Sequence, residues 1–246
     1  MLRILTYNVR RCLGLDRQLS PRRIASVIAA CRPDVIALQE LDVGRARSLG
    51  TDQAEEIARE LGMNHVHFHP ALKVLEEEYG DAIITAAGSR LVKAGPLPGI
   101  ARRPRLEPRG ALWVRIGSGK TTVDIVNTHL GLGRAERRAQ AAALLGPEWL
   151  GQDRGQTPSI LVGDFNSLPR GRVHRQITRR LRDAYYAAGT RIGPRSTFIS
   201  LFPVLRLDYV FVDPRLRVER IETVDTPEAR VASDHLPLVA DIEIAP

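Results

Sequence analysis

Long apolar runs are absent from this sequence of 246 residues. No stretch approaches the roughly 18 uninterrupted apolar residues that a membrane-spanning helix needs. The first residues, Met1 to Tyr7, lack an apolar signal core and a cleavage site, so we expect a cytoplasmic protein with no transmembrane segment. Cysteine is also scarce. Cys12 and Cys31 are the only two, and neither has a metal-binding spacing, which argues against a disulfide framework or a zinc site.

Lysine is scarce as well. Only three of the 36 basic residues are lysine, at positions 73, 93 and 120, and the rest are arginine. With 28 acidic residues the formal net charge is +8. The guanidinium group pairs in bidentate fashion with phosphate oxygens, although a GC-rich genome produces the same surplus of arginine. We ascribe most of the arginines to such bias and a few to function, and the positive field favours anionic substrates or surfaces.

Apolar residues make up 43% of the chain and charged residues 26%, as in ordinary globular proteins. Short β-type runs alternate with helical stretches and no linker or repeat divides them, so we expect an α/β architecture in a single domain over residues 1–246. Helices are predicted at 21–30, 52–61, 134–145 and 170–182. Strands are predicted near 2–7, 34–38, 65–69, 82–86, 91–95, 110–116, 121–128, 159–162, 207–212, 217–224 and 237–244, with a hairpin turn at 117–120.

Polar side chains recur at the ends of the predicted strands. In α/β proteins, sites gather where strand ends face a crevice. One such residue alone would be an ordinary cap or a structural histidine, whereas six such positions in one chain indicate a common site. These positions are Asn8, Gln39–Glu40, Asn127–His129, Asp164–Asn166, Asp208 and Asp234–His235.

The residue types at these positions suit one chemistry. Carboxylate and amide oxygens are hard donors, which select Mg²⁺ or Mn²⁺. His129 and His235 add groups that titrate near neutral pH, and Arg109 can hold a phosphate oxygen. A metal, a carboxylate that activates water, a histidine and an arginine together describe metal-assisted phosphoryl hydrolysis.

The motifs that carry these residues resemble, in their order, the endonuclease/exonuclease/phosphatase superfamily. The resemblance extends from residue 2 to about 244 and implies a four-layer α/β/β/α sandwich of two mixed β-sheets flanked by helices, with the active site at one edge between the sheets. The motifs are Thr6-Tyr7-Asn8, Leu38-Gln39-Glu40, Tyr79-Gly80-Asp81-Ala82, Pro108-Arg109-Gly110, Asn127-Thr128-His129-Leu130, Gly163-Asp164-Phe165-Asn166, Leu207-Asp208-Tyr209-Val210 and Ser233-Asp234-His235-Leu236-Pro237.

The resemblance also implies a role for the metal-binding and water-activating positions. Glu40 would be the principal ligand of Mg²⁺ or Mn²⁺, with Asn8 and Asp234 in or beside its shell. Asp164 would orient or deprotonate the attacking water.

Other positions would contact the phosphate. Asn166 would donate to a phosphate oxygen beside Arg109, and His129 would stabilise charge that develops on the phosphorus oxygens. His235 would contact the phosphate or act as general base, with Asp208 on its other ring nitrogen.

Asp81 stands where many phospholipase-like members have asparagine. We weigh two interpretations evenly. Asp81 pairs with His129 and raises the pKa of that ring, or it only ends a loop.

The leading interpretation is a metal-dependent hydrolase of a small or lipid-derived phosphodiester. The alternatives are a nuclease acting on DNA or RNA and, less favoured, a non-catalytic phosphate-binding module. No obligate protein partner is evident, whereas nucleic acid or an anionic membrane surface remains open as a partner.

Three segments are ambiguous. The predicted helix 170–182 carries arginines opposite an apolar stripe, either for a nucleic-acid backbone or membrane or as a solvated face. The apolar loop 198–205 lines a substrate groove or fills core. His65, His67 and His69 alternate on one strand face, where a face packed under a helix is favoured over a metal site.

Overall fold

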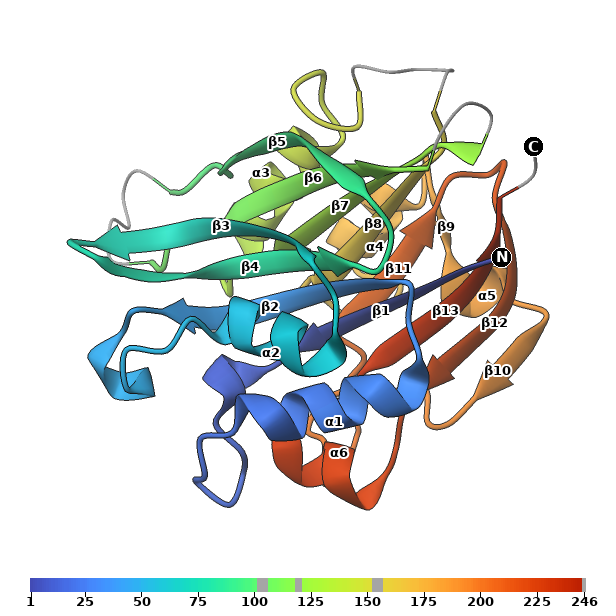
Figure 1. The fold of residues 1–246 in the computed structure, drawn as a ribbon. Helices are drawn as coiled ribbons and strands as arrows, with labels where there is room; N and C mark the ends of the chain where they lie inside the picture. The colour runs from blue at the N-terminus through green and yellow to red at the C-terminus, as the bar shows by residue number, and fades with distance from the viewer. Residues whose placement is uncertain (101–105, 118–120, 152–156, 245–246) are drawn as a thin grey trace.

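The computed structural model describes residues 1–100, 106–117, 121–151 and 157–244. The hairpin turn predicted at 117–120 lies outside the described residues apart from Gly117. Two mixed β-sheets form the centre of the molecule (Figure 1). In spatial order, the first sheet contains β10 (Thr190–Ile192), β12 (Arg217–Thr223), β13 (Leu238–Glu243), β1 (Leu2–Asn8), β2 (Val35–Val43), β4 (Glu77–Thr85) and β3 (His65–Val74). The second contains β5 (Ser89–Pro96), β6 (Gly110–Ile116), β7 (Val123–His129), β8 (Ser159–Asp164), β11 (Asp208–Val212) and β9 (Arg182–Asp183).

Helices cover the outer face of each sheet. On the first sheet lie α1 (Pro21–Cys31), α2 (Gln53–Leu61) and α6 (Pro227–Ala232), and on the second lie α3 (Arg134–Leu144) and α4 (Arg172–Ile177). The short α5 (Ala184–Ala187) and the 3-10 turns η1 (Arg10–Cys12) and η2 (Ala46–Ser48) complete the described elements. This arrangement confirms the predicted four-layer α/β/β/α sandwich.

Both faces of the central strands are buried, which explains their nearly continuous apolar sequences. In β1, Leu2 and Ile4 face the second sheet, while Leu5 and Tyr7 pack under the helices. The other central strands repeat this alternation, so the sandwich has one core between the sheets and one core under each helical layer.

The same alternation positions the polar strand ends. Because successive side chains point to opposite faces, a polar residue two positions beyond an inward apolar residue also points inward. Strand register then brings these ends together, since Asn8 pairs with Gln39, and Asp164 pairs with both His129 and Asp208. The inward polar residues are Asn8, Gln39, Asp81, Asn127, His129, Asp164 and Asp208.

Capping residues define the ends of α1 and α2 on the first sheet. The Ser20 hydroxyl accepts from the Arg23 N–H before Pro21, and the Asp52 carboxylate accepts from the Glu55 N–H. Gly62 ends α2 in the left-handed conformation with φ 66°. None of the described helices has the length and apolar character needed to cross a membrane.

The helix predicted at 170–182 is wrong in its bounds. Arg170 has φ 62°, which is not helical, so α4 begins only after Gly171. The helix ends at Ile177 because the following residues turn back and enter the second sheet, where Asp183 pairs with Phe211. The predicted apolar stripe is nevertheless buried, with Val173, Ile177 and Leu181 in the core under the second sheet.

Candidate active site

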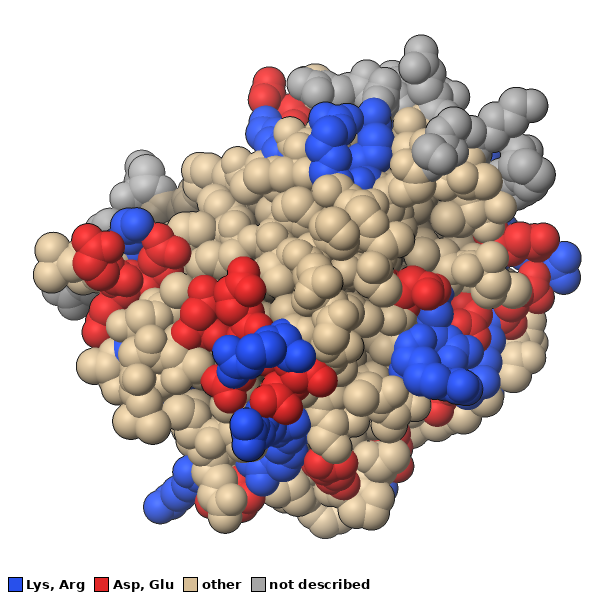
Figure 2. Space-filling view, viewed as in Figure 1, with Lys and Arg blue, Asp and Glu red and all other residues tan. Residues whose placement is uncertain are grey.

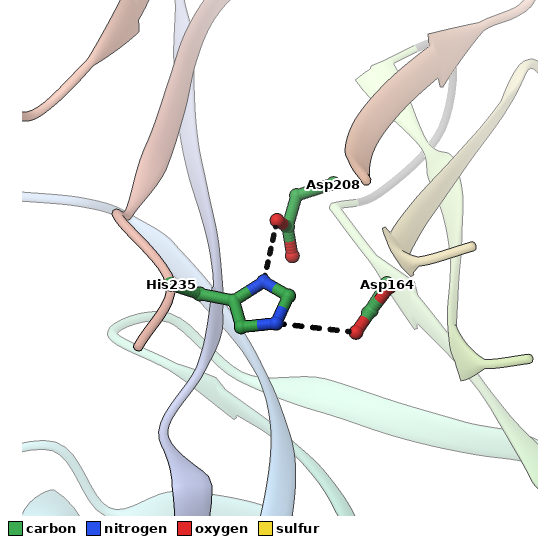
Figure 3. A group of neighbouring side chains, drawn as sticks. All are labelled: Asp164, Asp208 and His235. Atoms are coloured by element: carbon green, nitrogen blue, oxygen red, sulfur yellow. Dashed lines mark hydrogen bonds and ion pairs between the residues drawn. The ribbon is translucent and has the colours of Figure 1, made fainter. Parts of the chain in front are cut away.

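His235 lies between two buried aspartates (Figure 3). Its Nδ1 is 2.8 Å from Asp208 Oδ2, and its Nε2 is 3.7 Å from Asp164 Oδ2. Burial alone would lower the pKa of the His235 ring, but the charges of Asp208 and Asp164 raise it to about 10. His235 is therefore a cation at neutral pH, held in orientation by Asp208.

Asp164 joins several parts of the site. Its Oδ1 accepts from the Asn166 backbone N–H at 2.8 Å, and its Oδ2 accepts from Asn8 Nδ2 at 3.1 Å. Burial raises the pKa of the Asp164 carboxyl to about 7, with the Asp208 charge adding to the increase and His235 opposing it. A carboxyl group with a pKa near neutral is matched to proton transfer at physiological pH.

Glu40 reaches the site because β2 bulges. Alternation along an undisturbed strand would place Gln39 and Glu40 on opposite faces, but the register with β4 shifts between Leu38 and Leu41 and Glu40 has φ 63°. Glu40 Oε1 accepts from Asn8 Nδ2 at 3.0 Å. One amide nitrogen thus holds the carboxylates of Glu40 and Asp164 on either side of it.

Arg109 and Asn166 occupy the two ring nitrogens of His129. Nδ1 accepts from Arg109 Nη1 at 3.2 Å, and Nε2 is 3.0 Å from Asn166 Nδ2. Burial, together with the charge of Arg109, lowers the pKa of His129 far below its ordinary value, so the ring is neutral. A second contact, from Arg109 Nη1 to Glu107 Oε1 at 2.5 Å, orients the guanidinium.

Of the two interpretations weighed for Asp81, the pairing with His129 is wrong, because both ring nitrogens of His129 have other partners. The expected direction of the pKa shift at His129 is wrong as well, because the ring is buried beside a guanidinium. Asp81 is brought to the same region but accepts from the Glu40 backbone N–H instead, and burial raises the pKa of its carboxyl to about 7. Its contact therefore supports the bulge that presents Glu40.

Hydrogen bonds of Gln39 and Asn127 connect the two sheets beneath the site. The sequence did not predict these bonds, although both residues are among the polar positions at strand ends. Asn127 Oδ1 accepts from Gln39 Nε2 at 2.7 Å, and Asn127 Nδ2 donates to the carbonyls of Leu38 and Ala82. These bonds link β7 of the second sheet to β2 and β4 of the first. The only sequence signal for them is a pair of amide side chains at inward positions.

Asp234 lies beside Arg10, with Oδ2 3.5 Å from Nε. Within the described residues no hydrogen bond or ion pair joins Asp234 to Glu40 or Asn8. The loop before β11 is attached to this end of the site, because the Ser200 N–H donates to the Asp234 carbonyl and the Phe198 ring lies 4.9 Å from that of His235.

The alternating histidines of β3 do not lie under a helix as expected. Val66 and Phe68 face α2, so the histidines face the second sheet. His67 Nε2 lies 2.9 Å from Ser89 Oγ, and His69 packs against Gly110. These contacts join the edge of one sheet to the other.

The acidic groups of the site suit a hard cation. Single ligand atoms of Asp164, Asp208 and His235 lie within 4.8 Å of one another, but His235 is hydrogen-bonded to Asp208 and ion-paired with Asp164, so this trio is better described as a charge-paired unit than as a set of metal ligands. The partly exposed Glu40 carboxylate, with Asp164 nearby, offers oxygen donors of the kind that Mg²⁺ and Mn²⁺ prefer. Asn8 directs its N–H group toward them, because its oxygen accepts from the Arg10 N–H.

Comparison with known proteins agrees with the fold. The sequence matches the model of the Endonuclease/Exonuclease/phosphatase family over residues 5–235. A functionally unknown conserved protein from Enterococcus faecalis V583 has a similar structure, with 22% identity, a TM-score of 0.81, and coverage of 99% of this chain and 100% of that one. No curated protein matches the sequence.

Two similar structures carry functional names. A mannosyl-6-phosphatase from Bacteroides thetaiotaomicron VPI-5482 is 20% identical with a TM-score of 0.80, and the match covers 99% of this chain and all of that one. The human Nocturnin catalytic domain with bound sulfate anion is 21% identical with a TM-score of 0.73, and the match covers 99% of this chain and 93% of that one. At these identities the likeness establishes a common fold.

Proposed function

Because this chain belongs to the endonuclease/exonuclease/phosphatase family, we propose that it is a Mg²⁺- or Mn²⁺-dependent phosphodiesterase. The family comprises hydrolases of phosphoester bonds. The observation that carries the proposal is the pair formed by Asp164 and His235. A carboxyl with a pKa of about 7 lies 3.7 Å from a histidine with a pKa of about 10, so a proton acceptor and a cation are available side by side at neutral pH.

Glu40 would hold the metal ion, with Asn8 and Asp234 beside it. A bound divalent cation neutralises phosphate charge and polarises a phosphoryl oxygen. Asn8 donates to the carboxylates of Glu40 and Asp164, which keeps both directed toward one region. Asp81 accepts from the Glu40 backbone and maintains the bulge.

Asp164 accepts the proton of the attacking water in this mechanism. His235 is already protonated, so it cannot serve as the base and instead places positive charge against a phosphate oxygen. Asp208 fixes the orientation of the ring through Nδ1.

Three further side chains surround the position of the phosphate. Asn166 and Arg109 both contact the ring of His129, one at each ring nitrogen, so the three side chains form one contiguous group. An amide, a guanidinium and a neutral imidazole can each donate a hydrogen bond to a phosphoryl oxygen. We assign substrate binding and charge stabilisation to this group.

A small or lipid-derived phosphodiester is the substrate we propose. The support is the apolar loop at 198–205, which is attached to His235 yet exposes Ile199, Leu201, Phe202 and Val204, with Phe202 80% exposed. A nuclease is the second candidate, and the exposed arginines along α3 and α4 favour it. The intact catalytic group speaks against a non-catalytic module, which has no need of the Asp208–His235 pair.

Metal removal tests the proposed function. Turnover of bis-p-nitrophenyl phosphate should vanish in EDTA and return with Mg²⁺ or Mn²⁺, and Glu40→Ala should lower the rate and weaken the response to metal. Glu60→Ala, an exposed carboxylate on α2, is the matched control. Full activity in EDTA would refute the metal-dependent mechanism.

A further inference from the structure

A pocket of about 560 Å³ lies beside Asn166 and is lined by residues at the start of α3 and α4. These two helices lie on the outer side of the second sheet (Figure 1). The lining of the pocket contains no acidic residue. Four arginines line it together with Asn166 and Ser167, namely Arg134, Arg137, Arg138 and Arg172. The pocket is therefore a positively charged extension of the site that holds Asn166.

The charge of this pocket is not neutralised within the described chain. Arg134, Arg138 and Arg172 are exposed, and no ion pair between described residues includes any of them. On the face shown in Figure 2, by contrast, many basic side chains lie next to acidic ones. An anionic ligand is the natural counterpart of unpaired guanidinium groups.

Arg137 is held in position within the pocket. It donates to the carbonyls of Gly131 and Leu132, at 3.2 and 2.6 Å, in the loop that follows His129. Its buried Nε has no hydrogen-bond partner among the described residues. Burial and the neighbouring charge of Arg134 lower the pKa of Arg137, and the charges of Glu136 and Asp164 oppose this decrease without cancelling it.

We propose that this pocket is a subsite for a second phosphate group of the substrate, carried on the same molecule as the phosphodiester that is cleaved. The inference rests on the proposed function, because Asn166 links the pocket to the catalytic group through His129. A phosphate held by two or more arginines makes charge-assisted, bidentate hydrogen bonds. Such a phosphate occurs in a nucleotide chain and in a phosphorylated lipid headgroup, and both share this chemistry.

A second hollow provides a control on the same surface. It continues between α3 and α4 with a volume of about 620 Å³, shares Arg138 and Arg172 with the first, and adds Arg175 and Arg179. A substrate with only two phosphates needs the first pocket alone. Substitution of Arg175 and Arg179 should therefore leave the preference for a second phosphate intact.

The test compares substrates that differ by one phosphate. One pair is thymidylyl-thymidine with and without a 5′-terminal phosphate, and the other is glycerophosphoglycerol with and without a terminal phosphate. Diester cleavage is followed by mass spectrometry, and the readout is the ratio of kcat/KM within each pair. We expect the wild type to prefer the phosphorylated member of at least one pair by about tenfold or more, which corresponds to one charge-assisted contact.

Arg134→Ala with Arg138→Ala should remove most of this preference, whereas Arg175→Glu with Arg179→Glu should retain it. The pair that shows the preference identifies the source of the phosphate. Equal rates within both pairs, or a preference that survives the Arg134/Arg138 change, would overturn the subsite.

Binding separates this inference from the proposed function. Isothermal titration of the two thymidine compounds and of the two glycerol compounds into the Asp164→Asn protein measures affinity without turnover. Tighter binding of a phosphorylated member, lost in an additional Arg134→Ala and Arg138→Ala background, supports the subsite even if the wild type cleaves neither diester. Equal affinities within both pairs refute the subsite whatever the activity.

Discussion

Asp164 and His235, the two central residues of the site, differ in protonation state at neutral pH. Asp164 and His235 share a buried contact, yet burial and nearby charges leave one a weak acid and the other a cation. Asp164→Asn and His235→Ala should each lower kcat by at least about 10²-fold, the scale of general acid–base groups. The double variant should lose much less than the product of the two effects, because the residues act as one unit.

Steady-state kinetics on bis-p-nitrophenyl phosphate, with thermal melting to confirm folding, checks this expectation. A folded single variant with kcat near that of the wild type would remove its residue from the mechanism.

The pH dependence of kcat/KM follows from the same two groups. Asp164 must be deprotonated to accept a proton, so the rate should rise as the pH increases through about 7. His235 must be protonated to contact the phosphate, so the rate should fall as the pH increases through about 10. His235→Ala should abolish the alkaline limb of the profile and move the acid limb to higher pH, because the charge of His235 lowers the pKa of Asp164 in the wild type. An alkaline limb unchanged in that variant would assign it to another group.

Strand-end reasoning identified most of the residues that the structure brings together. Asn8, Glu40, His129, Asp164, Asp208 and His235 form one connected network. The partner of each side chain was harder to foresee. The positions of Asp81 and His129 at strand ends predict that both lie in the site. The contact of Arg109, just before β6, with His129 depends on the length and direction of its side chain, which the spacing of residues in the sequence does not encode. The proposed roles of these residues stay predictions.

At the scale of elements, local signals predicted helix starts and strand cores well. Ser20, Asp52 and Gly62 act through the backbone next to them, so their effect is readable in sequence. The end of α4 is set by tertiary structure instead, because the chain must return to pair with β11. The bulge in β2 is likewise invisible in the sequence, since it exists only in the register with β4.

Gly163 shows how an element places a residue of the candidate active site. It has φ 135°, and a Cβ there would collide with the backbone oxygen of Thr128 on β7. A side chain at this position would separate β8 from β7 and displace the adjacent Asp164. The glycine of the Gly-Asp-Phe-Asn motif is therefore required by the close approach of two strands.

The loop at 198–205 should select for apolar substrates. Its exposed side chains belong to the same loop as Phe198, whose ring contacts His235, and we expect an apolar leaving group to bury surface against them. Phe202→Ala should raise KM for a diester with an apolar leaving group by several-fold and leave KM for a polar one unchanged. Leu75→Ala, which removes another exposed apolar side chain, is the matched control. Equal effects on the two substrates would exclude this role.

At the scale of the whole molecule, alternation of apolar residues indicated an α/β class, but it could not assign strands to two sheets. That assignment came from the resemblance of ordered motifs to a family, and the structure confirms it. Pairing between strands distant in sequence, such as β1 with β13, leaves no periodic trace in a single sequence. The single-domain organisation stays a prediction.

Because of the net charge of the chain, the effect of salt on activity tests the substrate class. The chain carries a net charge of +8, and Arg175 and Arg179 line the second hollow, whose lining does not include Asn166. A small diester without a second phosphate contacts only the candidate active site, so salt should have little effect on its kcat/KM, and Arg175→Glu with Arg179→Glu should change that value by less than about twofold, in keeping with the weak effect of screened surface charges. Arg59→Glu with Arg90→Glu makes the same change of charge on other elements and is the control.

A nucleic-acid substrate would behave differently, since each phosphate neutralised on duplex DNA adds about −0.9 to the slope of log affinity against log salt. Efficient plasmid cleavage that falls steeply with salt and with the Arg175/Arg179 change, but not with the control change, would replace the small or lipid-derived diester with nucleic acid as the substrate.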